Sequence, residues 1–215
     1  MLIRSPRMAV ILLLLVSFIW GAEFVLIDLA IELIPTHTFN SVRFLLAALS
    51  LLPLLWFTRK QYAEICWLPL LGASALLGLL LFAGFYTQTE GMRYTSVSNA
   101  GFITGMNVPL VPLLGFLLFK TRAAISVWIG MITATCGLYL LTIGDKLEFN
   151  QGDVLVLVCA FCFAIHIILT GRFVDKLPVI PLSILQLFAV AIYSSVSAGL
   201  SYEPAFHHSG SSPLS

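Results

Sequence analysis

Two charged residues, Glu23 and Arg43, lie inside long apolar stretches and are the side chains of this sequence best placed to do chemistry. An ionisable group surrounded by lipid is costly, so each of them is a functional hypothesis. If the apolar stretches cross a membrane in alternate directions, Glu23 lies roughly 7–8 Å below one surface, at about 1.5 Å per helical residue, and Arg43 lies in the same layer. We therefore expect them to be close enough to pair.

A buried carboxyl group beside a guanidinium group is subject to two opposing effects. Burial favours the neutral acid, whereas the neighbouring cation favours the carboxylate. Glu23 could therefore be balanced so that it takes up and releases protons. Two simpler interpretations stay open: Glu23 and Arg43 form a fixed structural pair, or Arg43 extends to the outer surface.

Trp20, Glu23, Phe24 and Ile27 share one face of a helix. An aromatic ring beside a carboxylate suits an organic cation, because the ring face and the negative charge both attract it. Packing against a neighbouring helix is the simpler explanation of such a stripe.

Uncharged polar residues in other apolar stretches supply further candidates for a polar cavity. His166 lies deep in one stretch, where it could relay protons or bond to a neighbouring helix. Pro109 and Pro112 each remove a backbone donor, so the helix that contains them should kink and turn free carbonyl groups toward a cavity. The remaining candidates are Asn99, Thr104, Asn107 and Gln186.

No catalytic, metal or cofactor motif accompanies these residues. The sequence contains no HExxH motif, no GxSxG motif and no nucleotide-binding loop. Cys159 and Cys162, three residues apart in an apolar stretch, have no further metal ligand nearby and are expected to be packing residues. His207 and His208 are adjacent in a polar tail, which is weak evidence for a metal site. We expect no cofactor.

The composition defines the elements that must position these side chains. Of 215 residues, 60% are hydrophobic and 10% are charged, compared with about 45–50% and about 25% in soluble domains. A soluble domain is excluded, because so much apolar surface cannot be buried in one small core. The net charge of +1 offers no basic surface for nucleic acid. The lipid bilayer is therefore the expected environment.

Apolar stretches long enough to cross a bilayer occur about seven times, since a core about 30 Å thick needs roughly 20 helical residues. They are apolar on all faces, which favours helices over the alternating strands of a barrel. The predicted fold is an all-α integral membrane protein with about seven transmembrane helices. The expected helices cover 8–28, 37–57, 66–86, 97–119, 125–144, 152–171 and 179–201.

The distribution of Lys and Arg predicts how the chain crosses the membrane. If the spans alternate, eight of these residues fall near the ends on one side and two near the ends on the other. Short cytoplasmic loops are enriched in Lys and Arg, so the N-terminus should be cytoplasmic.

Small residues four positions apart predict where helices approach closely. Gly101 with Gly105, and Gly130 with Ala134, form two such pairs.

A segment near the N-terminus aligns without gaps with a segment 143 residues later, which indicates an internal repeat. The alternative explanation is that the two segments share only their hydropathy. A repeat unit of five helices is odd, so two copies would be inverted, with a binding site between them near the midplane. The expected division is a first repeat over 8–145, a partial second repeat over 152–201 and a polar disordered tail over 202–215. The aligned pairs include Trp20 with Phe163, Glu23 with His166, Pro35 with Pro178 and Arg43 with Gln186.

Several sequence blocks carry a family resemblance. They are Trp20-Gly21 with Phe24-Val25, Arg43-Phe44, GMRYTSVSNAGFITGMNVPLVPLLGFLLF from Gly91, and GDVLVLVCAF from Gly152. The chain thereby resembles the EamA-type branch of the drug/metabolite transporter superfamily. The resemblance implies two five-helix repeats and the export or exchange of small metabolites, amino acids or drugs, often driven by ion gradients.

The sequence departs from the family pattern in two places. Phe119-Lys120 stands where a Gly-Glu pair is usual, so any role of that glutamate is absent. The second repeat stops after its second helix, as it would in a truncated or frame-shifted product.

These observations predict a secondary transporter of small organic solutes, not an enzyme, which works by alternating access in the bacterial cytoplasmic membrane. A homodimer could complete a site that a partial second repeat leaves open. The alternatives are a non-transporting membrane interaction protein or a truncated, inactive remnant, and, with less support, a membrane-embedded enzyme.

Overall fold

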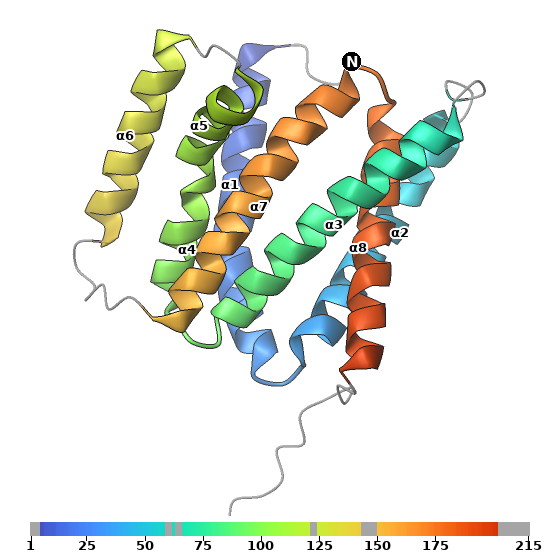
Figure 1. Cartoon of the computed structure of the whole chain (residues 1–215), viewed down its shortest axis with the longest axis horizontal. Coiled ribbons are helices and arrows are strands. Elements are labelled where there is room, and N and C mark those ends of the chain that lie inside the picture. The colour runs from blue at the N-terminus through green and yellow to red at the C-terminus, as the bar shows by residue number, and fades with distance from the viewer. Residues whose placement is uncertain (1–4, 59–61, 63–65, 121–123, 143–149, 202–215) are drawn as a thin grey trace, which may run out of the picture.

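The structure is a computed structural model that describes residues 5–58, 62, 66–120, 124–142 and 150–201. Within these ranges the chain forms a bundle of helices (Figure 1). The predicted tail over 202–215 and the end of the predicted fifth span lie outside the described residues. The helices are α1 (Pro6–Ile31), α2 (Thr36–Thr58), α3 (Trp67–Gly91), α4 (Val97–Gly105), α5 (Asn107–Phe119), α6 (Ile125–Thr142), α7 (Gln151–Val174) and α8 (Val179–Leu200).

The predicted all-α membrane architecture is confirmed. Six helical stretches of the described chain are long and apolar enough to cross a membrane, and α6 contributes a shorter apolar helix over Ile125–Gly137. α4 and α5 together make one of the six, over Val97–Leu118. Helices are the expected outcome, because lipid offers the backbone no hydrogen-bond partner and a helix satisfies its own groups.

The predicted end of the third helix is wrong. α3 continues past Tyr86 to Gly91, through the polar sequence Thr87-Gln88-Thr89-Glu90. These side chains are compatible with the helix because each finds a partner. Thr87 donates to the carbonyl of Ala83, while the others bond to residues of α2 and α4.

The predicted kink in the fourth span is confirmed as a break at Met106, between α4 and α5. Pro109 has no N–H for the carbonyl of Gly105, and Pro112 has none for that of Val108. The break lies at the middle of the span and brings Thr104 and Asn107 to either side of it.

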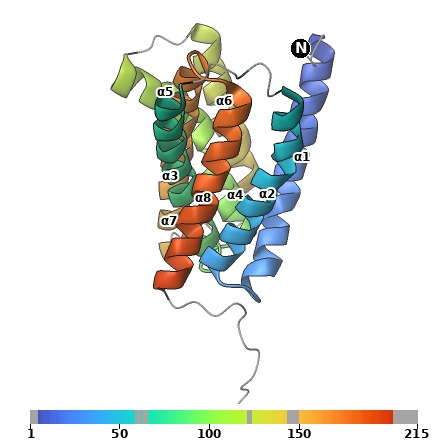
Figure 2. The ribbon, with the colours of Figure 1, turned by 90° about the vertical axis from the view of Figure 1, so that its right-hand side faces the viewer.

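α3 packs on both α7 and α8, and α2 packs on α8 (Figure 2). Close approach is achieved at Gly78, where an added Cβ would lie 2.9 Å from the carbonyl oxygen of Gln186 on α8. Two of the small residues proposed from the sequence do not mark a close approach of this kind. An added Cβ at Gly101 or Gly130 would meet no atom within 4 Å among the described residues.

α1 lies at the edge of the bundle and is held at one end only (Figure 2). Its C-terminal turns contribute Ile27 and Ile31 to a buried cluster with Met92, Ile103 and Val156. By contrast, almost all of its side chains from position 8 to position 19 are exposed.

The end of the bundle where α1 and α3 finish and α2, α4 and α7 begin is joined by polar contacts, and we call it the closed end. Thr36 donates to Glu90 (2.7 Å), and Arg93 donates to Thr36 (3.3 Å) and pairs with Glu90 (3.4 Å). Thr95 donates to the buried Asp153 (2.5 Å) at the start of α7. These bonds fix the helix ends to one another.

Candidate functional site

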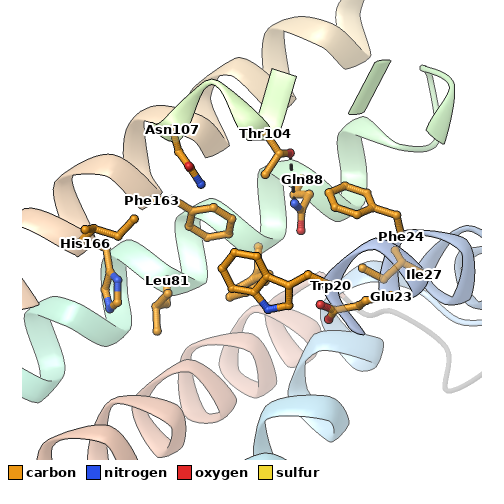
Figure 3. Close-up of a pocket in the computed structure, with 12 residues that line it drawn as sticks. Trp20, Glu23, Phe24, Ile27, Leu81, Gln88, Thr104, Asn107, Phe163 and His166 are labelled. Carbon is orange, nitrogen blue, oxygen red and sulfur yellow. Dashed lines mark hydrogen bonds between the residues drawn. The ribbon is translucent and has the colours of Figure 1, made fainter. Parts of the chain in front are cut away.

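A cavity of about 220 Å³ lies between α1, α3, α7 and the break that separates α4 from α5 (Figure 3). Its walls are mostly apolar and aromatic, with a few polar groups, which is the usual character of a small-molecule site. The lining residues are Trp20, Glu23, Phe24, Ile27, Leu81, Phe85, Gln88, Thr104, Asn107, Phe163, His166 and Ile167.

One wall of the cavity carries an ion pair. Arg43 of α2 pairs with Glu23 of α1, and their side chains are 19% and 31% exposed. The guanidinium group of Arg43 also lies over aromatic rings, 4.6 Å from the centroid of Phe85 and 5.0 Å from that of Phe44. Ring faces attract cations, so the aromatic residues help to hold the arginine at membrane depth.

The other polar groups of the cavity are uncharged side chains held by hydrogen bonds. Nε2 of His166 lies 3.0 Å from the side-chain oxygen of Gln186 on α8 and 3.4 Å from Thr170. Gln88 donates to Thr104 across α3 and α4 at 3.2 Å. Asn107, at the start of α5, is 7% exposed and lines the cavity beside them.

Glu23 and His166 lie at opposite ends of the cavity, with Trp20 and Phe163 between them (Figure 3). The site therefore has a carboxylate at one end, an imidazole at the other and aromatic rings along its length. A solute could meet charge, hydrogen bonds and apolar contact within one cavity.

The structure brings most of the residues predicted from the sequence together. Trp20, Glu23, Asn107 and His166 line the cavity directly. Arg43 and Gln186 stand behind the lining, bonded to Glu23 and His166 respectively.

Asn99 is placed elsewhere. It is 7% exposed in the first turn of α4, toward the closed end, and it does not line this cavity. Its side-chain oxygen has no hydrogen-bond partner among the described residues.

The contribution of α3, which supplies Leu81, Phe85 and Gln88 to the cavity, is not predicted from the sequence. Ending that helix at Tyr86 placed Gln88 in a loop, where a polar residue needs no explanation. Gln88 in a continued helix would have been an intramembrane polar group, and therefore a candidate on the same grounds as His166.

Residues that match in the sequence repeat also lie together in space. Glu23 and His166 line the same cavity, as do Trp20 and Phe163. Their partners match as well: Glu23 bonds to Arg43, and His166 bonds to Gln186, which is the position aligned with Arg43. Both pairs join a helix to the one that follows it.

The described residues offer no arrangement for a metal ion, since no three His, Cys, Asp or Glu side chains among them come together. What the lining groups can do is bind: attract a cation, exchange hydrogen bonds and enclose an apolar body.

The structure is thus a multi-pass helical bundle that contains a cavity of the size of a small solute. The model of the EamA-like transporter family matches residues 7–143. The chain belongs to this family.

Relatives of the chain are found among archaea and bacteria. An uncharacterized transporter of Archaeoglobus fulgidus is 32% identical over 85% of this chain and 55% of its own length. The uncharacterized inner membrane transporter YedA of Escherichia coli K12 is 31% identical over 68% of this chain and 47% of its own length. The chain thus spans about half the length of the curated relatives it matches. No solved structure matches it significantly.

Proposed function

We propose that the protein is a secondary transporter, not an enzyme, which carries small organic solutes across a bilayer by alternating access. The observation that carries this proposal is the Glu23–Arg43 ion pair at the wall of a cavity at membrane depth. Charges at this depth are costly, and a pair that faces a cavity is typical of a solute or ion pathway.

The packing around the cavity supports a site that opens toward one side at a time. Ile27 lines the cavity and also belongs to the buried cluster with Ile31, Met92 and Val156. Ile31, Met92 and Val156 lie nearer the closed end than the cavity residues of α1, α3 and α7 do, so they cover the cavity on that side. Toward the other end, the exposed half of α1 leaves the cavity without a comparable cover.

The inverted repeat supplies the movement in this proposal. We assign 8–145 to a first repeat and 152–201 to part of a second, and the pairs Glu23–Arg43 and His166–Gln186 to equivalent positions in them. Rocking one repeat against the other would open the closed end and cover the opposite one.

The proposed location is the bacterial cytoplasmic membrane, with the N-terminus in the cytoplasm. The printed name of the Escherichia coli relative, an inner membrane transporter, supports the membrane. The excess of Lys and Arg at the ends of the helices opposite the closed end supports the orientation.

Reconstitution in liposomes tests the proposed function. The purified chain is screened for uptake and efflux of labelled amino acids, amines and sugars, with and without a proton gradient. Glu23→Gln should abolish flux or uncouple it from protons, because the change removes the charge and keeps the shape. Glu32→Gln, an exposed position of the same segment, is the matched control and should leave flux unchanged. Unchanged proton-driven flux in Glu23→Gln contradicts the role of Glu23, and no flux of any solute contradicts transport.

A further inference from the structure

We infer that the solute is a small organic cation with an apolar or aromatic body, and that it binds Glu23 by displacing Arg43. This inference rests on the proposed function, because it names the chemical class of solute that the same cavity would take.

The charge of the cavity selects a cation. Among the residues that the structure describes, Glu23 is the only acidic one that lines the cavity, and no Lys or Arg lines it. An anionic solute would meet a carboxylate and no cationic side chain in the lining. A neutral solute would gain nothing from the carboxylate, which would stay with Arg43.

The apolar walls match the body of such a solute. Four aromatic residues from three different helices line the cavity: Trp20, Phe24, Phe85 and Phe163. A cation within about 6 Å of a ring centroid is attracted to the face of the ring, most strongly by Trp. Trp20 is one turn of α1 away from Glu23, so ring and carboxylate can engage one cation together.

Arg43 already occupies the position of a bound cation. Its guanidinium group pairs with Glu23 and lies 4.6 Å from the centroid of Phe85, which is itself a lining residue. The protein therefore shows that this combination of carboxylate and ring holds a positive charge. A cationic solute that enters the cavity makes the same two contacts and competes with the arginine.

The surroundings of Arg43 allow it to give up Glu23. Phe39 and Phe44 lie on its own helix, with ring centroids 5.8 Å and 5.0 Å from the guanidinium carbon, and they would continue to hold the charge. One of its terminal nitrogens, Nη1, is buried and has no hydrogen-bond partner among the described residues. The ion pair thus leaves one donor of the guanidinium group unsatisfied, so Glu23 does not account for all of the hydrogen bonds that this group can make.

The far end of the cavity accepts a second, uncharged polar group. His166 lies at that end, and Asn107, Gln88 and Thr104 line the cavity between it and Phe24 (Figure 3); none of these four carries a fixed charge. A solute with a cationic group at one end and a hydroxyl or amide group at the other would satisfy both ends of the cavity.

The test is direct binding of phenyltrimethylammonium to the full chain in detergent, measured by titration calorimetry. This probe keeps its charge at every pH, and tert-butylbenzene is its uncharged isostere. We expect the cation to bind at least about tenfold more tightly than the isostere, because one charge-assisted contact contributes enough free energy for a change of that size. Equal affinities for the two compounds would overturn the inference.

The two members of the ion pair should respond in opposite directions. Glu23→Gln should weaken binding of the cation at least about tenfold, whereas Arg43→Gln should strengthen it, because the internal competitor is gone. Glu32→Gln and Lys176→Gln, both at exposed positions, are the matched controls and should not change the affinity. If both ion-pair variants lose binding equally while folded, the pair is structural and the inference fails.

Two further variants keep the test decisive if Arg43→Gln does not fold. Arg43→Lys retains the positive charge and should bind the probe with nearly the affinity of the original chain. Trp20→Leu should weaken binding several-fold, whereas Trp67→Leu, at a position 57% exposed and outside the cavity, should not. Equal effects of the two tryptophan changes would place the probe elsewhere and overturn the inference.

Failure of this inference can be told apart from failure of the proposed function. Flux of neutral or anionic solutes in liposomes, without binding of the cation, leaves the transporter and removes the cation selectivity. Binding of the cation without flux of any solute leaves the site and removes transport.

Discussion

Replacing Gly78 by alanine should destabilise the contact between α3 and α8. The added Cβ would lie 2.5 Å from the Cβ of Ala189 and 2.9 Å from the carbonyl oxygen of Gln186. Neither atom is the end of a flexible side chain, so the helices must separate by several tenths of an ångström. Overpacking of this kind typically costs about 1–3 kcal/mol. Because one clashing atom belongs to Gln186, the shift should also disturb its bond to His166.

Gly72→Ala on the same helix is the matched control for this change. A Cβ at Gly72 meets nothing within 4 Å among the described residues. Both substitutions gain the same helix propensity, about 1 kcal/mol, so this gain cancels in the comparison. The free energy of unfolding, measured by denaturant titration in detergent, should be about 1–3 kcal/mol lower for Gly78→Ala than for Gly72→Ala. Equal stabilities of the two variants would refute the packing of α3 against α8.

Three other perturbations test the closed end, the broken helix and the orientation. Thr95→Val leaves a buried oxygen of Asp153 without its donor and should lower the free energy of unfolding by about 1–3 kcal/mol in the same titration. Pro109→Ala restores a backbone N–H at the break, so α4 and α5 should straighten and the distance between spin labels at their far ends should increase. In a variant without native cysteines, an impermeant maleimide should label Glu32→Cys in intact cells and Lys176→Cys only after the membrane is opened.

Each of these three has a control or a contradicting outcome. Thr133→Val removes an exposed hydroxyl that bonds within its own helix, so a loss as large as that of Thr95→Val would contradict a special role for Asp153. Spin labels at the exposed Ser98 and Leu117 report the break, and an unchanged distance would show that Pro109 does not cause it. Labelling of Lys176→Cys in intact cells would reverse the predicted orientation.

The helices and the ion pair were accessible to prediction from the sequence because lipid restricts the possibilities. A long apolar run in a bilayer must satisfy its own backbone, so hydropathy locates the helices. Two opposite charges at the same depth have few other partners, which is why the pairing of Glu23 with Arg43 could be predicted. The break near Pro109 follows from a missing backbone donor.

The sequence does not show which face of each helix contacts another helix. Gly101 and Gly78 look alike in sequence, yet only Gly78 faces another helix closely, because the rotation of each helix is set by the whole bundle. The same reason separates Asn107, which lines the cavity, from Asn99, which does not. The sequence does not reveal Gln88, because a polar run such as residues 87–90 is typical of the end of a helix. In the structure, residues of α2 and α4 bond to Gln88, Thr89 and Glu90 and let the helix continue.

The attachment of α1 has a consequence for the time course of assembly. Ile27 packs in a cluster with Val156, which is made more than a hundred residues later. At about 5–20 residues per second, the first helix waits roughly ten seconds in the bilayer before that partner is synthesised. Arg43, by contrast, follows within seconds on the next helix, so α1 and α2 can form their ion pair as a hairpin at once. The pair then shields both charges from lipid until the rest of the bundle arrives.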